Sequence, residues 1–313
     1  MVRVGIIGGA GYTGGELLRI LLYHPMVSIA SVQSQSHAGK KISSVHRDLL
    51  GDIDLVFEEK ISPDLDVLFL CSGHGQGKSF MDAQNILEKT LVIDLSADFR
   101  LDDDWIYGLP ETNRTQIQNS NRIANCGCFA TAIQLGLYPL TTKNLIQSEI
   151  HVTAITGSTG AGQALSISTH FSWRNNNLSV YKPFTHQHLG EIRRNLNLDQ
   201  PLTFIPIRGD FTRGILASIT FDSDLSLEEL TAIYKESTRD EPFTHFVEEN
   251  PDLKQVVNTN HCFVYVEKHQ QKVLVVSILD NLLKGASGQA VQNMNIRLGF
   301  PEKAGLNLKA SVF

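Results

Sequence analysis

The segment Val4-Gly5-Ile6-Ile7-Gly8-Gly9-Ala10-Gly11-Tyr12-Thr13-Gly14, near the start of the chain, decides the fold class. The apolar run before the glycines is typical of a buried parallel strand, and leucines recur at helical spacing after them. A glycine-rich turn between strand and helix lets the backbone approach a pyrophosphate at the helix N-terminus. The spacing G-x-x-G-x-x-G departs from the strict G-x-G-x-x-G pattern, so a plain tight turn is the alternative. We expect dinucleotide contacts from Gly8, Gly11, Tyr12, Thr13 and Gly14.

Further apolar runs predict the rest of the fold. Residues 27–33, 67–71 and 91–95 indicate strands separated by helix-like stretches, which favours a parallel, doubly wound sheet. Longer runs from residue 150 onward predict strands at 150–155, 203–207, 214–221, 262–267 and 272–279. Helices are expected at 129–137, ending before Pro139, at 224–237 with a cap at Ser226, and at 288–298. The predicted class is α/β: a Rossmann-type parallel-sheet domain plus an α+β domain with a mostly antiparallel sheet.

Composition excludes several classes of protein. A chain of 313 residues suggests about two domains, and 42% hydrophobic with 19% charged residues is ordinary for a soluble protein. The net charge of -6 gives no basic footprint for nucleic acid, and no apolar run is long enough for a membrane span. The four cysteines are too few for a disulfide scaffold, and their spacing is poor for a metal. We therefore expect no metal, no nucleic acid, no membrane and a reducing, cytoplasmic compartment.

The stretch 33–41, after the second predicted strand, refines the cofactor. An NAD site usually has Asp or Glu there to bind the ribose 2′-hydroxyl. This stretch has no acid, but its hydroxyls and two lysines suit a 2′-phosphate, with solvated loop residues as the alternative. We expect NADP(H) rather than NAD, bound by Ser34, Ser36 and Lys40. Residues 71–75 follow another strand at its C-terminal end, where ligands bind in such sheets, so Cys71, Gly73 and His74 join the expected cofactor contacts.

Cys128 in Asn125-Cys126-Gly127-Cys128-Phe129-Ala130-Thr131 is the candidate nucleophile. A helix N-terminus and a nearby protonated histidine both favour the thiolate, and Cys128 directly precedes a helix-like run. Cys126 is the weaker candidate, and two inert buried thiols are the alternative. A thiol and a hydride carrier together can interconvert an activated acyl group and an aldehyde through a thioester.

Partners for the thiol lie further along the chain. His186 and His188, at i and i+2, would point the same way in an extended chain, and Glu191 could orient one ring, although structural histidines are the alternative. Arg208 and Arg213 could grip a carboxylate or phosphate by two hydrogen bonds, or form salt bridges instead. Two more glycine-rich loops, 157–162 and 281–289, are candidates for the nicotinamide and acyl pocket. From these loops we expect Ser158 at the substrate and Gly160, Asn281 and Gly285 at the cofactor.

These segments resemble one family along essentially the whole chain: the N-acetyl-γ-glutamyl-phosphate reductases of the aspartate-semialdehyde dehydrogenase-like superfamily. The resemblance is carried by the glycine turn, by the Cys128 and His186/His188 segments, and by Arg213-Gly214-Ile215. It also covers residues 94–101, 107–111 and the highly specific string 280–295, while 171–177 resembles the branch found in Bacteroidetes. Within these strings we expect Ser96 at the cofactor and Asn125 and Arg100 at the substrate.

The resemblance implies a function and a domain plan. Cys128 would be the nucleophile, with His186 or His188 as base; His186 is favoured, with Glu191 orienting it. The reaction implied is NADPH-dependent reduction of an N-acyl-γ-glutamyl phosphate to the semialdehyde in arginine biosynthesis, the acyl group being acetyl or, as suspected for the Bacteroidetes-like branch, succinyl. A Rossmann domain, 1–127, would be completed by a C-terminal helix, 286–313. Residues 128–285 would form the catalytic, substrate and oligomerisation domain of a homodimer or homotetramer.

Three positions depart from the family pattern. Cys126 replaces the proline of Asn-Pro-Gly-Cys, Gly190 replaces the proline before Glu191, and Pro206-Ile207-Arg208 replaces Pro-His-Leu. The last change lies near the expected substrate pocket, where the added carboxylate of a succinyl group would suit Arg208. Two other functions stay open: a phosphorylating semialdehyde dehydrogenase for an aminoadipyl phosphate, and an NADP-binding regulator without chemistry.

Overall fold

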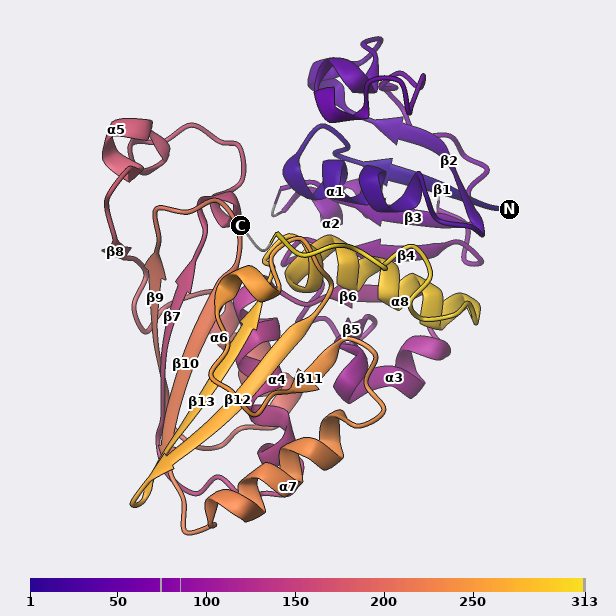
Figure 1. Cartoon of the computed structure of the whole chain (residues 1–313). Helices are drawn as coiled ribbons and strands as arrows, with labels where there is room; N and C mark the ends of the chain where they lie inside the picture. The colour runs from indigo at the N-terminus through magenta and orange to yellow at the C-terminus, as the bar shows by residue number, and fades with distance from the viewer. Residues whose placement is uncertain (74, 85, 312–313) are drawn as a thin grey trace. The chain divides into compact units, whose positions relative to one another are not determined.

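The chain divides into two compact units in a computed structural model that describes residues 1–73, 75–84 and 86–311 (Figure 1). Unit 1 comprises Met1–Gly127 and Ala286–Asn307, and unit 2 comprises Cys128–Gly285 and the residues from Leu308. Among the described residues, no helix is long and apolar enough to cross a membrane.

A six-stranded parallel sheet, in the order β2-β1-β3-β4-β6-β5, forms the centre of unit 1. Every residue of β3 and β4 is buried, as expected for parallel strands covered on both faces. The predicted parallel, doubly wound sheet is therefore confirmed. The strands are β1 (Val2–Ile7), β2 (Val27–Gln33), β3 (Val67–Leu70), β4 (Leu91–Asp94), β5 (Ile106–Gly108) and β6 (Arg122–Asn125).

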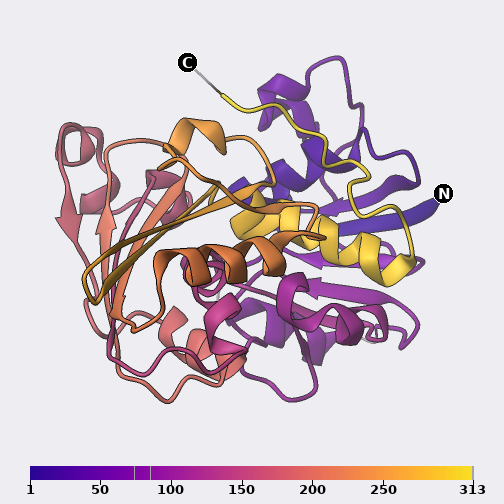
Figure 2. The ribbon, with the colours of Figure 1, turned by 60° about the horizontal axis from the view of Figure 1, so that its bottom comes forward.

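Helices of unit 1 include one from the far end of the sequence. The helices are α1 (Tyr12–Leu21), α2 (Gln76–Ala83), α3 (Pro110–Gln118) and α8 (Gly288–Leu298). Helix α8 packs against α1, α3 and the strands β4, β5 and β6 (Figure 2). The expected helical segment 286–313 is α-helical only over α8, because Gly299 adopts the left-handed conformation (φ +67°) and Pro301 follows it.

Unit 2 is built on a seven-stranded sheet in the order β11-β12-β13-β10-β7-β9-β8. The β12–β13, β13–β10, β10–β7 and β9–β8 pairs are antiparallel, while β7–β9 and β11–β12 are parallel. The sheet is thus mixed and mostly antiparallel, as predicted. The strands are β7 (Ile150–Thr156), β8 (Ser179–Val180), β9 (Leu202–Arg208), β10 (Ile215–Asp222), β11 (Thr244–Phe246), β12 (Cys262–His269) and β13 (Lys272–Leu279).

Helix α4 is the central helix of unit 2 and corrects one prediction. It packs on β10, β12 and β13 and against α6 and α7. The prediction that this helix ends before Pro139 is wrong, because α4 includes Pro139. Although proline removes one helical hydrogen bond, burial of nearly the whole helix keeps it continuous. The helices of unit 2 are α4 (Cys128–Thr141), α5 (Phe171–Arg174), α6 (His188–Leu196) and α7 (Leu227–Thr238), the last capped by Ser226 as predicted.

Candidate active site

The glycine turn between β1 and α1 has the geometry of an anion site. Gly8 has φ +74°, and a Cβ there would lie 2.7 Å from the carbonyl oxygen of Cys71. A Cβ on Gly14 would lie 2.7 Å from the carbonyl oxygen of Gly8, so the backbone itself requires both glycines. A Cβ on Gly11 would meet only that same oxygen, at 3.5 Å, so the space beside Gly11 fits a ligand. No side chain caps the first turn of α1, which begins at Tyr12 and contains Thr13, and its N–H groups suit a pyrophosphate.

Gln33, at the end of β2, occupies the place where an NAD site usually has an acid. Its Oε1 accepts from the backbone N–H of Gly8 (3.4 Å), and its Nε2 donates to the carbonyl of Glu59 (3.2 Å). An uncharged amide at this position does not repel a 2′-phosphate, as a carboxylate would. The sequence pattern placed this position correctly but did not single out Gln33.

The three residues expected at a 2′-phosphate lie in the loop that follows Gln33. The backbone N–H of Ser34 donates to the carbonyl of Glu58 (3.0 Å), which fixes the start of the loop. The hydroxyl of Ser36 lies 2.9 Å from Nδ1 of His37, and Lys40 is exposed. The loop therefore presents a hydroxyl and an amine to solvent beside the glycine turn.

The residues after β3 contribute polar groups near the same turn. The hydroxyl oxygen of Ser72 is buried with no hydrogen-bond partner among the described residues, as expected where a ligand completes the site. Burial raises the pKa of the Cys71 thiol to about 12, so this thiol is not a nucleophile. The carbonyl of Gly73 accepts from Gln76 at the start of α2, while His74 lies outside the described residues.

Ser96 has two partners within unit 1. Its hydroxyl donates to Asp94 (2.7 Å) and accepts from the backbone N–H of Asp98 (3.0 Å). Burial raises the pKa of Asp94 to about 6, against the lowering effect of the Ser96 hydrogen bond. Ser96 is only 2% exposed, so it supports the end of β4 from inside the unit.

Asn125 and Arg100, expected at the substrate, hold backbone in unit 1. Asn125 donates to the carbonyl of Ala286 (3.1 Å) and accepts from Asn293 (3.0 Å). Nε of Arg100 donates to the carbonyl of Asn125 (2.9 Å), and its Nη2 donates to the carbonyl of Leu95 (3.2 Å). Both side chains therefore fix the end of β6.

The two cysteines near this point have different surroundings. Cys126 is 1% exposed, its thiol donates to the carbonyl of Gly108 (3.7 Å), and its sulfur accepts from Nε2 of Gln289. Cys128 is half-buried and is the first residue of α4, as predicted. A Cβ on Gly285 would lie 2.8 Å from Cβ of Cys128, so glycine lets the 281–285 loop pass beside the thiol. In place of the family's proline, Cys126 fixes its turn by side-chain contacts.

The histidine pair lies at the start of α6. Both rings are buried, with centroids 4.6 Å apart, although the backbone is not extended as expected, because Gln187 is helical (φ −57°, ψ −24°). The backbone N–H of His188 donates to Nδ1 of His186 (3.3 Å), which puts the proton of neutral His186 on Nε2. Oε1 of Glu191 lies 3.8 Å from Nε2 of His188, so the carboxylate expected to orient His186 faces the ring of His188 instead. Burial, and to a smaller extent Lys182, lowers the pKa of His186 to about 4.

Aromatic contacts bring the histidines next to the start of α4. The ring of Phe129 meets that of His186 edge-on, with centroids 5.6 Å apart. The ring of Tyr181 lies 5.7 Å from the same imidazole. Burial and, second, the nearby Cys128 raise the pKa of Tyr181. Cys128, Tyr181 and His186 therefore converge in unit 2; Tyr181 was not predicted, because it stands outside any motif.

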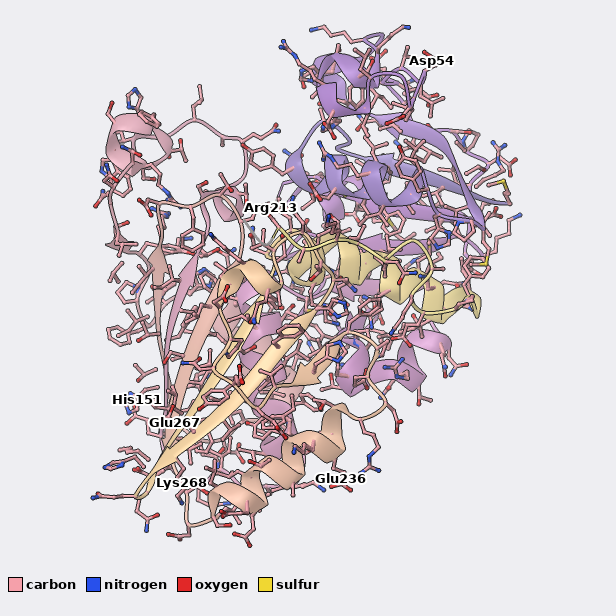
Figure 3. All side chains as sticks on the ribbon, in the orientation of Figure 1. Asp54, His151, Arg213, Glu236, Glu267 and Lys268 are labelled. Atoms are coloured by element: carbon pink, nitrogen blue, oxygen red, sulfur yellow. The ribbon has the colours of Figure 1, made fainter. Side chains whose placement is uncertain are left out.

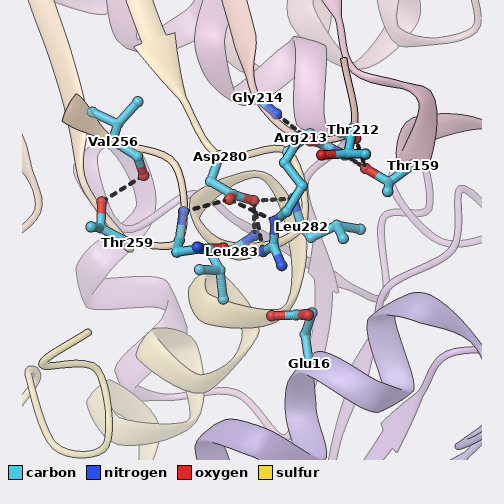
Figure 4. Close-up of polar contacts among 12 residues, drawn as sticks. Glu16, Thr159, Thr212, Arg213, Gly214, Val256, Thr259, Asp280, Leu282 and Leu283 are labelled. Carbon is cyan, nitrogen blue, oxygen red and sulfur yellow. Dashed lines mark hydrogen bonds and ion pairs between the residues drawn. The ribbon is translucent and has the colours of Figure 1, made fainter. Parts of the chain in front are cut away.

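Arg213 forms a buried ion pair. Its Nε and Nη2 donate to the two carboxylate oxygens of Asp280 (2.9 and 3.1 Å; Figure 4). Asp280 is fully buried and also accepts from the backbone N–H groups of Asn258 and Leu282 (both 2.8 Å). The pair lies at one end of the sheet, and Lys268 at the other (Figure 3). The salt-bridge alternative thus describes Arg213, although the pair is buried rather than exposed.

Asn281 links the glycine-rich loops of unit 2. Its Oδ1 accepts from the backbone N–H of Gly214 (2.7 Å), and its Nδ2 donates to the hydroxyl of Thr159 (3.0 Å). The backbone N–H of Ser158 donates to the carbonyl of Phe211 (2.8 Å), and a Cβ on Gly160 would lie 3.3 Å from the hydroxyl of Thr156. The structure therefore brings together the loops around residues 158–160, 211–214 and 280–285.

Comparison with known proteins identifies the class. The family model "Semialdehyde dehydrogenase, NAD binding domain" matches residues 3–120, and "Semialdehyde dehydrogenase, dimerisation domain" matches residues 128–281. A structure of aspartate semialdehyde dehydrogenase II from Vibrio cholerae, complexed with ASA, has a TM-score of 0.75 at 16% identity over 96% of this chain and 98% of that one. A Candida albicans aspartate semialdehyde dehydrogenase with NADP has a TM-score of 0.73 at 14% identity over 97% and 99%. The fold and the half-buried thiol at the head of α4 define an oxidoreductase of the semialdehyde dehydrogenase class.

Closer relatives identify the family. Proteins named N-acetyl-gamma-glutamyl-phosphate reductase from Azobacteroides pseudotrichonymphae and Phocaeicola vulgatus are 53% and 52% identical, each over 100% of both chains. That of Flavobacterium johnsoniae is 52% identical, again over the full length of both. The chain belongs to the N-acetyl-γ-glutamyl-phosphate reductase family, and the predicted resemblance and enzyme class are confirmed.

Proposed function

We propose that this protein reduces an N-acyl-γ-glutamyl phosphate to the N-acyl-glutamate semialdehyde in arginine biosynthesis, with NADP(H) as cofactor. The observation that carries the proposal is the convergence of Cys128 at the head of α4 with Tyr181 and His186. Membership of the reductase family supports the substrate class. Unit 1 is assigned the cofactor, and unit 2 is assigned substrate binding, catalysis and assembly.

The first chemical step is acyl transfer to Cys128. The thiolate attacks the γ-acyl carbon, a C–S bond forms, the C–O bond to phosphate breaks, and phosphate leaves with the electron pair. The N-terminus of α4 favours the thiolate over the neutral thiol. Its first-turn N–H groups also suit the oxygen that becomes negative in the tetrahedral intermediate.

The second step is reduction of the thioester. NADPH, when bound, supplies the hydride. The thioester oxygen then becomes negative, and Nε2–H of His186 donates a hydrogen bond to it. The low pKa of His186 keeps the imidazole neutral and its proton on Nε2. Breaking the C–S bond then releases the aldehyde and returns Cys128 as thiolate. The backbone N–H of His188 holds His186 in position, and Glu191 faces the ring of His188.

For the cofactor, the glycine turn supplies the pyrophosphate site, and the loop after β2, residues 34–41, supplies the 2′-phosphate site. The space beside Gly11 and the uncapped first turn of α1 support the first assignment. Gln33 in place of an acid, with Ser34, Ser36 and exposed Lys40, supports NADP(H) over NAD. The remaining expected contacts, Cys71, Gly73, His74, Ser96, Gly160, Asn281 and Gly285, are retained as proposals.

For the substrate, Ser158 and Arg208 remain the direct contacts that we propose. Arg208 lies with its Cζ 4.2 Å from the ring centroid of Tyr181. Because Arg213, Arg100 and Asn125 have protein partners, we assign them positioning roles. Arg208 also motivates a succinyl group as the alternative to acetyl, since a second carboxylate would suit a second cation.

Assembly is proposed to occur through unit 2. The family model over residues 128–281 is named a dimerisation domain, and we infer a homodimer or homotetramer. Unit 2 also exposes large apolar side chains, which monomers rarely gather in one region. Six of them stand between residues 165 and 184: Leu165, Ile167, Phe171, Leu178, Val180 and Phe184. All four cysteines are free thiols, which suits a reducing cytoplasm.

The reverse reaction tests this function. With NADP⁺, inorganic phosphate and N-acetyl- or N-succinyl-glutamate semialdehyde, we expect phosphate-dependent formation of NADPH. The Cys128→Ser variant should lose turnover by at least about a thousandfold and still bind NADPH, while Cys126→Ser should retain turnover. Activity retained in Cys128→Ser would refute the mechanism. A folded protein that binds NADPH but turns over neither semialdehyde would point to the aminoadipyl substrate or to a regulator.

A further inference from the structure

Arg174, the last residue of α5, carries a buried charge without a carboxylate partner. It is 8% exposed, and its Nε is buried with no hydrogen-bond partner among the described residues. Burial is the main cause that lowers the pKa of Arg174. Taking a guanidinium out of water is unfavourable unless an anion compensates it. The compensating group is therefore expected from a ligand.

Arg208, at the end of β9, is the second cation of this region. Its charge is the second cause of the lowered pKa of Arg174, so the two guanidinium groups repel each other. Nη1 of Arg208 donates to the hydroxyl of Ser168 (3.3 Å), which leaves the charge uncompensated. Tyr181 and, to a smaller extent, Asp210 favour the charged form of Arg174 more weakly. Within the described residues, neither Arg174 nor Arg208 forms an ion pair with a carboxylate. Two like charges held together in this way indicate an anion site.

Tyr181 connects this arginine pair to the catalytic centre. Cζ of Arg208 lies 4.2 Å from the centroid of the tyrosine ring, and the same ring lies 5.7 Å from the imidazole of His186. Cys128 raises the pKa of the Tyr181 hydroxyl, while Arg208 and Arg174 act in the opposite direction. Helix α5 and strands β8 and β9 lie at the same edge of unit 2 (Figure 1). An anion held by the arginines would thus lie near the reacting thiol.

We propose that Arg174 and Arg208 together form a carboxylate-binding subsite for the substrate, with Tyr181 between this subsite and Cys128. The inference rests on the proposed function, because it concerns the same substrate. Each planar guanidinium can bind a carboxylate by two parallel hydrogen bonds, which an ammonium cannot do. The carboxylate has two possible sources: the α-carboxylate of the glutamyl moiety, or the terminal carboxylate of a dicarboxylic acyl group.

Steady-state kinetics of NADP⁺ reduction separate these sources. In Arg174→Gln we expect kcat/KM for the semialdehyde to fall about 10- to 100-fold, mainly through KM, while KM for phosphate is unchanged. Arg174→Lys should recover only part of the loss, because lysine keeps the positive charge but cannot form the two parallel hydrogen bonds of a guanidinium. An equal loss with N-acetyl- and N-succinyl-glutamate semialdehyde assigns the α-carboxylate. A loss confined to the succinyl substrate assigns the acyl carboxylate.

Controls and a second probe keep the inference open to refutation. Arg193→Gln, which removes an exposed charge of α6, should leave unchanged both kcat/KM for the semialdehyde and KM for phosphate. Unchanged kcat/KM in Arg174→Gln, or a raised KM for phosphate alone, would overturn the inference. In Arg174→Gln, the rate of Cys128 alkylation by iodoacetate, relative to that by iodoacetamide, should fall severalfold. In Arg174→Lys, this relative rate should return to the wild-type value. Because alkylation needs no turnover, an inactive wild-type protein with this response would refute the proposed function and leave the anion site intact.

Discussion

Two arginine-containing regions of unit 2 differ in one respect: whether the protein compensates the charge. Arg213 donates twice to buried Asp280, which also accepts from backbone N–H groups of two loops. Arg174 and Arg208 form no ion pair within the described residues and repel each other. The first region is complete without a ligand and holds the loops together. The second region has no counter-charge from the protein for its two guanidinium groups. This difference distinguishes an arginine with a structural role from an arginine that binds an anionic ligand.

The largest effect should follow from breaking the compensated pair. Asp280→Asn keeps the shape of the side chain but leaves Arg213 without its counter-charge. We expect a loss of about 3–5 kcal/mol in the free energy of unfolding, measured by urea denaturation. Asp222→Asn, which removes the exposed partner of Lys272, is the matched control and should change stability by less than about 1 kcal/mol. A small effect of Asp280→Asn would remove the contrast between the two regions.

The uncompensated region should respond in the opposite direction. Arg174→Met removes a buried charge and relieves its repulsion with Arg208, while the apolar stem is kept. We therefore expect the free energy of unfolding to rise by about 1 kcal/mol even though substrate affinity falls. Urea denaturation in the absence of substrate measures this. Destabilisation by more than about 1 kcal/mol would mean that Arg174 is compensated in the free protein after all.

His186 extends the comparison to pH. Its pKa is lowered from 6.5 to about 4 in the folded protein, so between these values the unfolded chain binds the proton more readily. Stability from this residue is complete above about pH 6.5 and is lost as the pH falls toward 4. His186→Asn should therefore lose less stability than wild type between pH 6.5 and 4.5, by thermal unfolding. His151→Asn, which removes an exposed ring, should keep the pH dependence of stability of the wild type. Equal slopes of stability against pH for wild type, His186→Asn and His151→Asn would contradict a buried, neutral imidazole at His186.

The last prediction concerns Cys126 and Cys128, one a buried thiol with protein partners and the other half-buried. Cys126 is buried with Gly108 and Gln289 as partners, so Cys126→Ala should lower the free energy of unfolding by about 1 kcal/mol. Turnover should remain, because the nucleophile that we propose is Cys128. Loss of turnover in folded Cys126→Ala would instead assign chemistry to Cys126.

Local patterns in the sequence predicted much of the fold. The bounds of β2, β13 and α8 agree with prediction, because alternation, helical spacing and glycines act over a few residues. Where packing at a distance decides, prediction was wrong: α4 continues through Pro139, and Gln187 is helical.

For the candidate site too, local motifs were predicted and contacts between distant segments were not. Cys128 and the glycine turn stand in recognisable motifs, and the structure places the thiol at a helix start as predicted. The Arg213–Asp280 pair joins residues 67 positions apart, and Tyr181 meets Arg208 across two strands. Such pairs depend on the register of the sheet, which composition and spacing within one segment do not encode.

The most direct test of the central claim is a single-turnover burst without phosphate. Enzyme mixed with NADP⁺ and N-acetyl- or N-succinyl-glutamate semialdehyde should form one equivalent of NADPH per active site and then stop. Intact-mass analysis should show Cys128 carrying the matching acyl group, and added phosphate should restart turnover. A burst that Cys128→Ser retains, or steady phosphate-independent turnover without acylated Cys128, would contradict the thioester mechanism.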